Sequence, residues 1–166
     1  MAIEIPIQEL KEIVHYDPET GIMKWAKLLN ARAPIGKECG RTMTRGYRAF
    51  IVRRKTIYTH RAAWAYVNGS WPKNTIDHIN GNKSDNRISN LREATSGENN
   101  RNSKTPKSNT SGVKGVSWNS KHQRWRARVG INKKDIHVGE FLTIQQAENA
   151  IIEMRKTLHG EFARHA

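Results

Sequence analysis

The sequence predicts an α+β protein made of small units rather than one large core. Apolar residues make up 36% of the 166 residues and the mean hydropathy is −0.78, values that suit small units with much polar surface. A second observation is the run SKTPKSNTSG at 103–112, whose Ser, Thr, Asn and Lys content is typical of a linker. After it, short strand-like runs are followed by one amphipathic helix.

Residues 1–55 are expected to form a β-rich N-terminal segment. Pro6 suits the first turn of a helix, and the Asp-Pro-Glu-Thr-Gly run at 17–21 is turn chemistry between two apolar runs, which predicts a β-hairpin. Gly69 has the position of a residue that ends a helix. The elements expected in this part of the chain are a helix at 5–14, a hairpin at 16–25, strands at about 47–52 and 56–59, and a helix from about 60 to 69.

The formal net charge of +14 indicates an anionic partner, either nucleic acid or a membrane surface. No run of about 18 apolar residues occurs and the first residues are acidic, so we expect no membrane contact and no secretion. The basic residues concentrate in residues 104–142 and around Arg54. Cys39 is the only cysteine, which excludes an intrachain disulfide and a cysteine-rich site, so no structural zinc is expected.

The run TIDHINGNKSDNRISNL at 75–91 places an ionisable pair in front of a loop rich in amides. Asp77 and His78 are neighbours, so their side chains can reach one site only where a strand ends. The runs TIDHI and ISNL are expected as two strands. Downstream, Thr95 and Glu98 have the spacing of a capping box at a helix start. The predicted unit is strand, loop, strand and helix.

These residue types suit the hydrolysis of a phosphodiester, which needs a metal ion near the phosphate and a base for water. Asp77 and Asn99 offer the oxygen ligands that hard divalent cations prefer. His78 suits the base, because an unperturbed imidazole is largely neutral at neutral pH. Asn90 could hold the loop or fix His78 through the backbone. The alternatives are a plain surface Asp-His pair and a calcium loop, but Ile79 occupies a position where the latter needs an oxygen ligand.

The motif DHINGN…DNRISNLREAT…ENNRN resembles the HNH nucleases with a ββα-metal fold, in the version common among phage and homing endonucleases. The runs YDPETGIMKW and THRAAWAYVNGSWP resemble segments that precede the motif in such phage proteins, so the resemblance covers most of residues 10–103. It implies a nuclease unit at 56–103 in which His78 is the general base and Asn90 orders the loop.

The resemblance also implies a divalent cation, Mg²⁺ or another ion such as Mn²⁺, on Asp77 and Asn99. Asn100, the neighbour of Asn99, is the alternative second ligand. His60 is a further candidate for contacting phosphate or the active site, against the commoner role of capping or packing a helix. A phage-type nuclease would act in the cytoplasm of the host cell and leave 5′-phosphate and 3′-hydroxyl ends.

A separate DNA-binding domain is expected at 111–166, after a linker at 104–110. The alternation in WRARV places Trp125, Ala127 and Val129 on one face of a strand and arginines on the other. A helix at 143–159 begins with a Thr-x-x-Gln capping box and has one apolar stripe, for which packing on the sheet is favoured over a partner helix. We therefore expect a three-stranded antiparallel sheet packed on one helix.

This run also resembles the ethylene-response-factor type (apetala-two) of DNA-binding domain, which lays a three-stranded sheet in the major groove. This sequence departs from the family in the first strand, where Ser117 and Asn119 occupy positions that are often Arg in the plant transcription factors. The base preference of the family therefore cannot be inferred for this protein. A solvated sheet face is the alternative. DNA is favoured over RNA because a sheet fits the major groove of B-form DNA. The implied DNA contacts are Lys114, Arg126 and Arg128, with Trp118 and Asn119 as further candidates.

The sequence thus predicts a metal-dependent DNA endonuclease, a site-directed nicking or homing enzyme of phage type, with double-stranded DNA as partner. One active site cuts one strand and no dimerisation helix is evident, so we expect a monomer or a weak dimer. The alternative is a sequence-specific DNA-binding regulator with a vestigial nuclease unit, which the complete motif disfavours. A third hypothesis is a non-specific RNA-binding protein.

Overall fold

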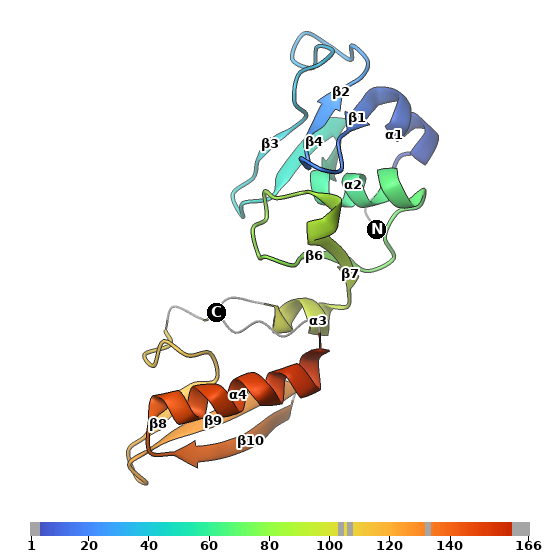
Figure 1. The fold of residues 1–166 in the computed structure, drawn as a ribbon. Helices are drawn as coiled ribbons and strands as arrows, with labels where there is room; N and C mark the ends of the chain where they lie inside the picture. Colours follow the sequence, from blue (N-terminus) through green and yellow to red (C-terminus); the bar gives the residue numbers. More distant parts are fainter. Residues whose placement is uncertain (1–3, 103–104, 106–107, 132–133, 161–166) are drawn as a thin grey trace. The chain divides into compact units, whose positions relative to one another are not determined.

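The computed structural model describes residues 4–102, 105, 108–131 and 134–160, without the side chains of residues 100, 101 and 159 (Figure 1). Helices alternate with small antiparallel sheets, so the predicted α+β class is confirmed. The chain divides into two compact units, unit 1 at Met1–Thr95 and unit 2 at Ser96–Ala166. This division precedes the linker expected at 104–110, parts of which lie outside the described residues, as do 161–166. Each unit is described by itself.

Unit 1 contains both the N-terminal segment and most of the expected nuclease unit. The expected hairpin corresponds to β1 and β2, and the Asp17 carboxylate accepts a 2.8 Å hydrogen bond from the Thr20 hydroxyl in their turn. Gly69 ends α2 with a φ of 69°, a conformation that favours glycine. The elements of unit 1 are α1 (Ile7–Ile13), β1 (Val14–Tyr16), β2 (Met23–Trp25), β3 (Arg41–Thr42), β4 (Arg48–Val52), β5 (Lys55–Tyr58), α2 (Thr59–Asn68), β6 (Thr75–His78), the 3-10 helix η1 (Ile88–Asn90) and β7 (Leu91–Ala94).

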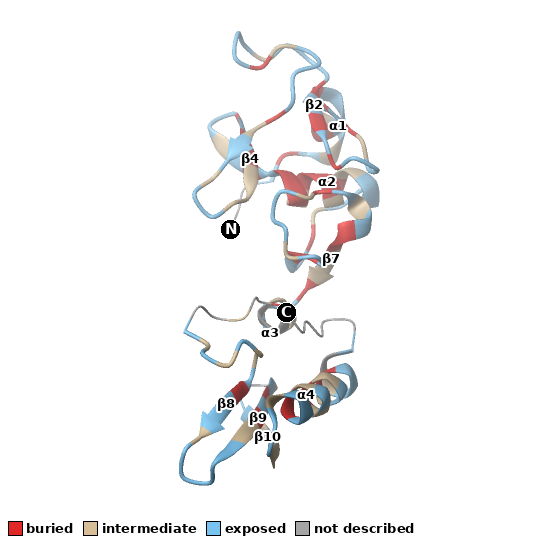
Figure 2. Cartoon of the chain, turned by 60° about the vertical axis from the view of Figure 1, so that its left-hand side comes forward, coloured by how far each residue is buried: buried red, intermediate tan, exposed pale blue. Residues whose placement is uncertain are grey.

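The core of unit 1 forms between α1, α2 and the small sheets. Leu10 of α1, Val14 of β1 and Met23 of β2 are fully buried. Five of the ten residues of helix α2 are buried, three of them alanines, and the helix is red along part of its length in Figure 2. Its first turn therefore enters the interior, which places the ring of His60 inside the unit.

Strands β6 and β7 form an antiparallel pair in which Asp77 lies opposite Arg92 and His78 opposite Leu91. The expectation of a strand along ISNL is wrong in its first three residues, which form η1, and β7 begins at Leu91. The physical reason is a backbone turn at Asn90, whose N–H donates to Arg87 O at 2.9 Å and whose carbonyl accepts from the Ile79 N–H at 2.9 Å. The loop between the strands is thereby anchored beside the end of β6.

Unit 2 contains a three-stranded antiparallel sheet, in the order β10–β9–β8, packed on one helix. Ala127 and Val129 of β9 are buried against Ala147 and Ile151 of α4. The capping box expected at the start of this helix is present, between the side chains and backbone of residues 143 and 146. The elements of unit 2 are α3 (Ser96–Arg101), β8 (Val116–Asn119), β9 (Arg124–Ile131), β10 (Lys134–Phe141) and α4 (Ile144–His159).

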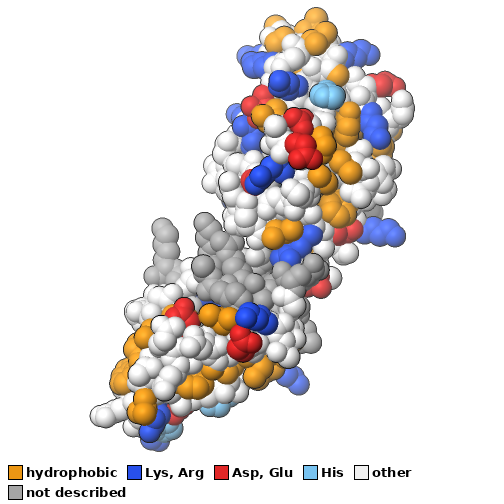
Figure 3. Space-filling view, viewed as in Figure 1, with side chains coloured by type: hydrophobic (Ala, Val, Ile, Leu, Met, Phe, Trp, Pro, Cys, Tyr) orange, Lys and Arg blue, Asp and Glu red, His pale blue; other side chains and the backbone are white. Residues whose placement is uncertain are grey.

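Charged side chains of both signs cover the surface. On the face seen in Figure 3, Lys and Arg lie beside Asp and Glu rather than in one continuous basic patch. No single basic patch on this face therefore accounts for the net charge of +14. Among the described residues no helix is both long enough and apolar enough to cross a membrane.

Candidate active site

Asp77 and His78 lie buried at the end of β6, and each is only 4% exposed. Neighbours on a strand point to opposite sides. Their hydrogen bonds agree with this, because Asp77 interacts with Arg92 on β7 whereas His78 interacts with Asn86 in the loop. The site therefore consists of two adjacent side chains that are anchored independently.

Asp77 forms a buried ion pair with Arg92. The two residues stand directly opposite each other in the β6–β7 register, and Arg92 Nε and Nη2 donate to Asp77 Oδ2 at 2.9 and 2.8 Å. Removing one partner of such a pair leaves a buried charge behind, which costs about 3–5 kcal/mol. Arg92 thus holds the Asp77 carboxylate in one orientation.

His78 is held by the side chain of Asn86, which is also buried. The His78 Nε2 and the Asn86 Oδ1 are 3.1 Å apart, and Asn86 Nδ2 donates to the Ser84 carbonyl at 3.4 Å. Because the amide nitrogen of Asn86 is directed at a carbonyl, its oxygen faces the ring and accepts. In the neutral ring the proton then lies on Nε2, and Nδ1 is the nitrogen able to accept a proton.

Burial lowers the pKa of His78 below 6.5, while the hydrogen bond with Asn86 and the charge of Asp77 act in the opposite direction. The ring is therefore neutral at neutral pH. A neutral imidazole is the form that can take a proton from water.

Two rings pack against His78, and a third packs against those two. The His60 ring centroid lies 5.2 Å from that of His78, and the Tyr47 centroid lies 6.0 Å from it. Tyr47 in turn lies 5.0 Å from His60, and Tyr58 lies 5.7 Å from His60. This ring cluster (Tyr47, Tyr58, His60 and His78) joins β5, α2 and β6 and limits the rotation of the His78 ring.

His60 is unusual within the cluster because it is polar, 7% exposed and has no hydrogen-bond partner at Nδ1 among the described residues. Burial, followed by the neighbouring His78, lowers the pKa of His60 to about 3. The ring is therefore neutral. The buried, unpaired Nδ1 of His60 lowers the stability of the fold, whereas an apolar ring at this position would not. The contact between His60 and His78 therefore needs a functional explanation.

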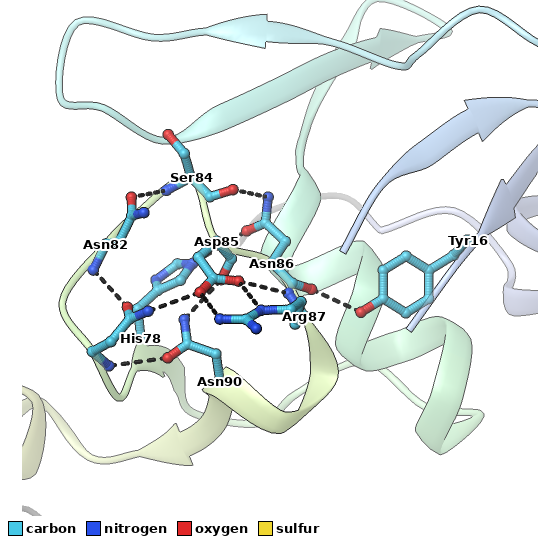
Figure 4. Close-up of polar contacts among 9 residues, drawn as sticks. Tyr16, His78, Asn82, Ser84, Asp85, Asn86, Arg87 and Asn90 are labelled. Atoms are coloured by element: carbon cyan, nitrogen blue, oxygen red, sulfur yellow. Dashed lines mark hydrogen bonds and ion pairs between the residues drawn. The ribbon is translucent and has the colours of Figure 1, made fainter. Parts of the chain in front are cut away.

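Asn90 orders the loop between the two strands (Figure 4). Its Oδ1 accepts from the Asn80 N–H at 3.0 Å, and its Nδ2 donates to the Asp85 carbonyl at 2.8 Å. One side chain thereby ties the beginning of the loop to its end. Because His78 is adjacent to the beginning of the loop and Asn86 lies at its end, this tie keeps the two within hydrogen-bonding distance.

The remaining amides of the loop satisfy its backbone. Asn80 Oδ1 accepts from the Asn82 N–H at 2.8 Å, and Asn82 Oδ1 accepts from the Ser84 N–H at 3.1 Å. Asp85 receives two bonds from Arg87, at 2.8 and 2.6 Å. Short polar side chains of this kind replace the backbone partners that a strand or helix would supply. This accounts for the amide-rich composition of the run.

The predicted metal ligands fall in different units. Asp77 belongs to unit 1, whereas Asn99 lies on α3 in unit 2, and the side chain of Asn100 lies outside the described residues. No cluster of three or more His, Cys, Asp or Glu side chains within the described residues could hold a metal. A carboxylate with amide and water oxygens nevertheless fits a hard divalent cation, so the ligand types agree with Mg²⁺ or Mn²⁺.

Sequence reasoning missed Asn86, Arg92 and Tyr47. Asn86 lies within the DNR run and could have been suspected from the amide-rich loop. The pairing of Arg92 with Asp77 depends on a strand register that ISNL, taken as a strand, would have shifted. Nothing in the sequence marks Tyr47, which comes from a distant loop.

The outer face of the unit 2 sheet carries a row of arginines. On the central strand β9, Ala127 and Val129 are buried under α4, so Arg124, Arg126 and Arg128 alternate with them on the opposite face. Arg124 extends the predicted contacts by one position. The row follows the middle strand of the sheet.

Of two further predicted contacts, only Asn119 lies on this face, where it pairs with Arg124. Trp118 pairs with Trp125 and therefore belongs to the face that packs on α4; its ring is 49% exposed and lies edge-on to that of Trp125, with centroids 5.1 Å apart. The Asn119 amide donates to Glu140 at 2.7 Å, and His122 lies 2.7 Å from the other oxygen of Glu140. A carboxylate therefore lies among the basic residues and already engages Asn119.

Lys114 precedes β8 and is half-buried. Its carbonyl accepts a hydrogen bond from Arg155, a buried residue of α4. Gly115 follows with a φ of 75°, and a Cβ there would lie 2.5 Å from the Arg128 carbonyl oxygen. The backbone at Lys114 is therefore fixed against both the helix and the central strand.

Comparison with known proteins identifies the family of the segment that contains the candidate active-site residues. The family model described as HNH endonuclease matches residues 57–101, which include Asp77, His78, Asn90 and Asn99. Protein 3.8 of Escherichia phage T7 is 40% identical over 123 residues, covering 74% of this chain and 98% of that protein. No solved structure matches. Nothing in these comparisons identifies unit 2 as an apetala-two domain.

Proposed function

Because this chain belongs to the HNH endonuclease family, we propose that it is a metal-dependent DNA endonuclease that hydrolyses phosphodiester bonds, as a site-directed nicking or homing enzyme of phage type. The observation that supports this most is the state of His78. Its ring is neutral, enclosed, and fixed through Asn86 in the tautomer that can accept a proton at Nδ1.

In the proposed reaction His78 removes a proton from a water molecule. The water oxygen forms the new bond to phosphorus while the bond to the 3′ oxygen breaks, and the leaving oxygen is protonated by solvent. The products have 5′-phosphate and 3′-hydroxyl ends. Asn90 contributes indirectly, because it keeps His78 and Asn86 in contact.

Asp77 and Asn99 would hold the divalent cation, Mg²⁺ or another such as Mn²⁺, with Asn100 as the one-position alternative. When bound, this ion neutralises charge on the phosphate and on the leaving oxygen. The ion pair with Arg92 fixes the orientation of the Asp77 carboxylate but also places a positive charge beside it, so the assignment of Asp77 rests on the sequence motif and the family match. The assignment of Asn99 rests on the sequence motif and the family match, because that residue belongs to the other unit.

His60 is proposed as a positioning residue rather than a phosphate contact. Its ring packs against His78 and is buried, and its neutral state adds no positive charge next to the base. A ring in this place excludes alternative orientations of His78.

Unit 2 is proposed to bind double-stranded DNA through the outer face of its sheet. Arg124, Arg126 and Arg128 form one row on the middle strand. Trp118 remains a proposed contact, although it pairs with Trp125 and so belongs to the face that packs on α4. Asn119 and Lys114 remain proposed contacts, although the Asn119 amide has Glu140 as its partner. Likeness to an apetala-two domain remains part of this proposal. We propose a monomer or weak dimer acting inside the host cell.

The alternative function is a sequence-specific DNA-binding regulator with a vestigial nuclease unit. The arginine row on β9 favours DNA binding in either case. The two functions differ in whether the Asp77–His78 site is active, which an activity assay decides directly.

The test is cleavage of supercoiled plasmid and of a random-sequence duplex pool with Mg²⁺, with Mn²⁺ and with chelator. We expect metal-dependent cutting that His78→Ala reduces by about 10²–10⁴-fold, the usual contribution of a general base. His15→Ala, an exposed histidine of the same unit, is the matched control and should cut normally. Tight, salt-sensitive duplex binding without any cleavage by the native protein would favour the regulator instead.

A further inference from the structure

The turn between β4 and β5 has an unfavourable composition for its shape. Val52 pairs with Lys55, so the turn consists of two residues, Arg53 and Arg54, whose φ values are 51° and 62°. Positive φ at both positions is the backbone of a type I′ turn, for which Asn-Gly is strongly preferred. Arginine has a Cβ that disfavours this conformation. Backbone strain of this kind is retained where the side chains have a use.

The two arginines are available to different degrees. Arg53 forms an ion pair with Glu9 at 3.0 Å, although 69% of its side chain is exposed. Arg54 is exposed, and within the described part of the chain it has no ion-pair or hydrogen-bond partner. The turn therefore presents one unneutralised guanidinium and one that a competing anion could attract.

The turn ends an exposed sheet face. In β4, Phe50 and Val52 point into the core, whereas Ile51 is exposed on the other side. Residues on this outer side include Tyr58, which pairs with Ala49, and Arg41, which pairs with Ala49 from β3. No acidic residue occurs in β3, β4, β5 or the turn, but Glu9 and Glu12 of α1 line one hollow together with Ile51 and Arg53. We name Arg41, Ile51, Arg53, Arg54 and Tyr58 the turn face.

The turn face leads to the candidate active site. Tyr58 ends β5, and its ring lies 5.7 Å from that of His60 and 6.0 Å from that of Tyr47. Both of those rings contact His78. Three steps of strand separate Lys55 from Tyr58, a length of about 10 Å. One strand of duplex DNA carries a phosphate about every 3.4 Å along the axis, so this length corresponds to about three phosphates.

We propose that the turn face binds the sugar-phosphate backbone of duplex DNA next to the scissile phosphate, with Arg54 as its principal contact. The inference rests on the proposed function, because it assumes that the bond to be cut lies at His78. It assigns to unit 1 a DNA contact of its own, separate from the arginine row of unit 2. The basic residues and the absence of acidic ones on these strands suit a polyanion, and the exposed Ile51 and Tyr58 suit the deoxyribose that lies between phosphates.

The test replaces the turn with the pair that its backbone prefers. Arg53→Asn/Arg54→Gly should raise the Tm, because Asn-Gly relieves the strain. For each phosphate that this variant no longer binds, DNA affinity should fall by about eightfold at 0.1 M salt and the salt slope of log K by about 0.9. A merely structural defect could not combine greater stability with weaker binding.

Binding is measured in the His78→Ala background, so that cleavage does not interfere. The charge-matched control is Arg32→Asn/Lys73→Asn, two exposed residues of unit 1 outside the turn face. The control should weaken binding clearly less than the turn variant. Hydroxyl-radical footprinting should show that the turn variant no longer protects one stretch of one strand beside the cut.

The outcomes separate the two proposals. Normal cleavage by the native protein with unchanged affinity, slope and footprint in the turn variant overturns the turn face and leaves the nuclease. Absent cleavage with turn-dependent binding overturns the nuclease and supports the turn face as a DNA-binding surface. Equally weakened binding in the turn variant and the control shows a general effect of charge and overturns the turn face.

Discussion

The candidate active site and the arginine row of β9 differ in how their polar side chains are held in place. At the active site each side chain is buried and has a fixed partner, as Arg92 is for Asp77 and Asn86 for His78. On β9 the arginines alternate with the buried Ala127 and Val129 along a strand, with Arg124 and Arg128 exposed and Arg126 half-buried. Cleavage of one bond needs a single arrangement of the reacting groups, whereas phosphate binding tolerates several arrangements. Substitutions at the active site should therefore have larger effects on stability and rate, and a residue of the same charge should not restore them.

The largest expected effect tests whether the buried partners are necessary. Arg92→Met leaves the Asp77 carboxylate buried without this partner and should lower the free energy of unfolding by about 3–5 kcal/mol, measured by urea denaturation. The control within the same unit is Arg87→Met, which removes the more exposed pair with Asp85 and should lower the free energy of unfolding much less. Similar destabilisation in both variants would contradict the prediction that the buried pair contributes more to stability than the exposed one.

A smaller effect sharpens the role of the ring cluster. His60→Ala removes a buried ring and should cost about 2–4 kcal/mol of stability. If the ring also positions His78, kcat should fall while KM for DNA stays close to its native value. His60→Phe keeps the ring and removes the unpaired Nδ1, so it should restore both stability and kcat. Restored stability with a low kcat would instead indicate a polar role for His60.

The smallest effect concerns the exposed region. Arg128→Ala should leave stability unchanged, weaken duplex binding by about eightfold at 0.1 M salt and lower the salt slope by about 0.9. The rate of cleavage at saturating DNA should not change. Lys156→Ala, an exposed basic residue of α4, is the control and should leave the slope unchanged. A fall in the saturated rate with Arg128→Ala would mean that unit 2 does more than bind.

The sequence was sufficient where one local pattern determines one element. Alternation in WRARV gave the inner and outer faces of β9, and the Thr143–Gln146 spacing gave the start of α4. Asp77 and His78 could be singled out because two ionisable residues next to an amide-rich run suggest a site. Each of these inferences uses residues that are close in the chain.

Features that depend on distant residues could not be obtained in this way. The contact between His78 and the ring of Tyr47 joins segments about thirty residues apart, and the pairing of Asp77 with Arg92 depends on where β7 begins. The turn at Arg53 and Arg54 was unpredictable for another reason: its composition contradicts the preference of the backbone it adopts. Local rules fail there because tertiary packing overrides them.

The hydrogen bond from the Tyr16 hydroxyl to the Asn86 carbonyl, at 2.7 Å, has a consequence for protein engineering. It connects the N-terminal hairpin to the residue that fixes the base, and a side chain on Gly21 would collide with the backbone of Arg87. The segment that matches the nuclease family therefore depends on residues outside it and cannot be transferred alone to another protein. A chimaera that contains only residues 57–101 on another scaffold would lack the N-terminal hairpin that packs against the loop. A graft that begins at α1 would include this hairpin.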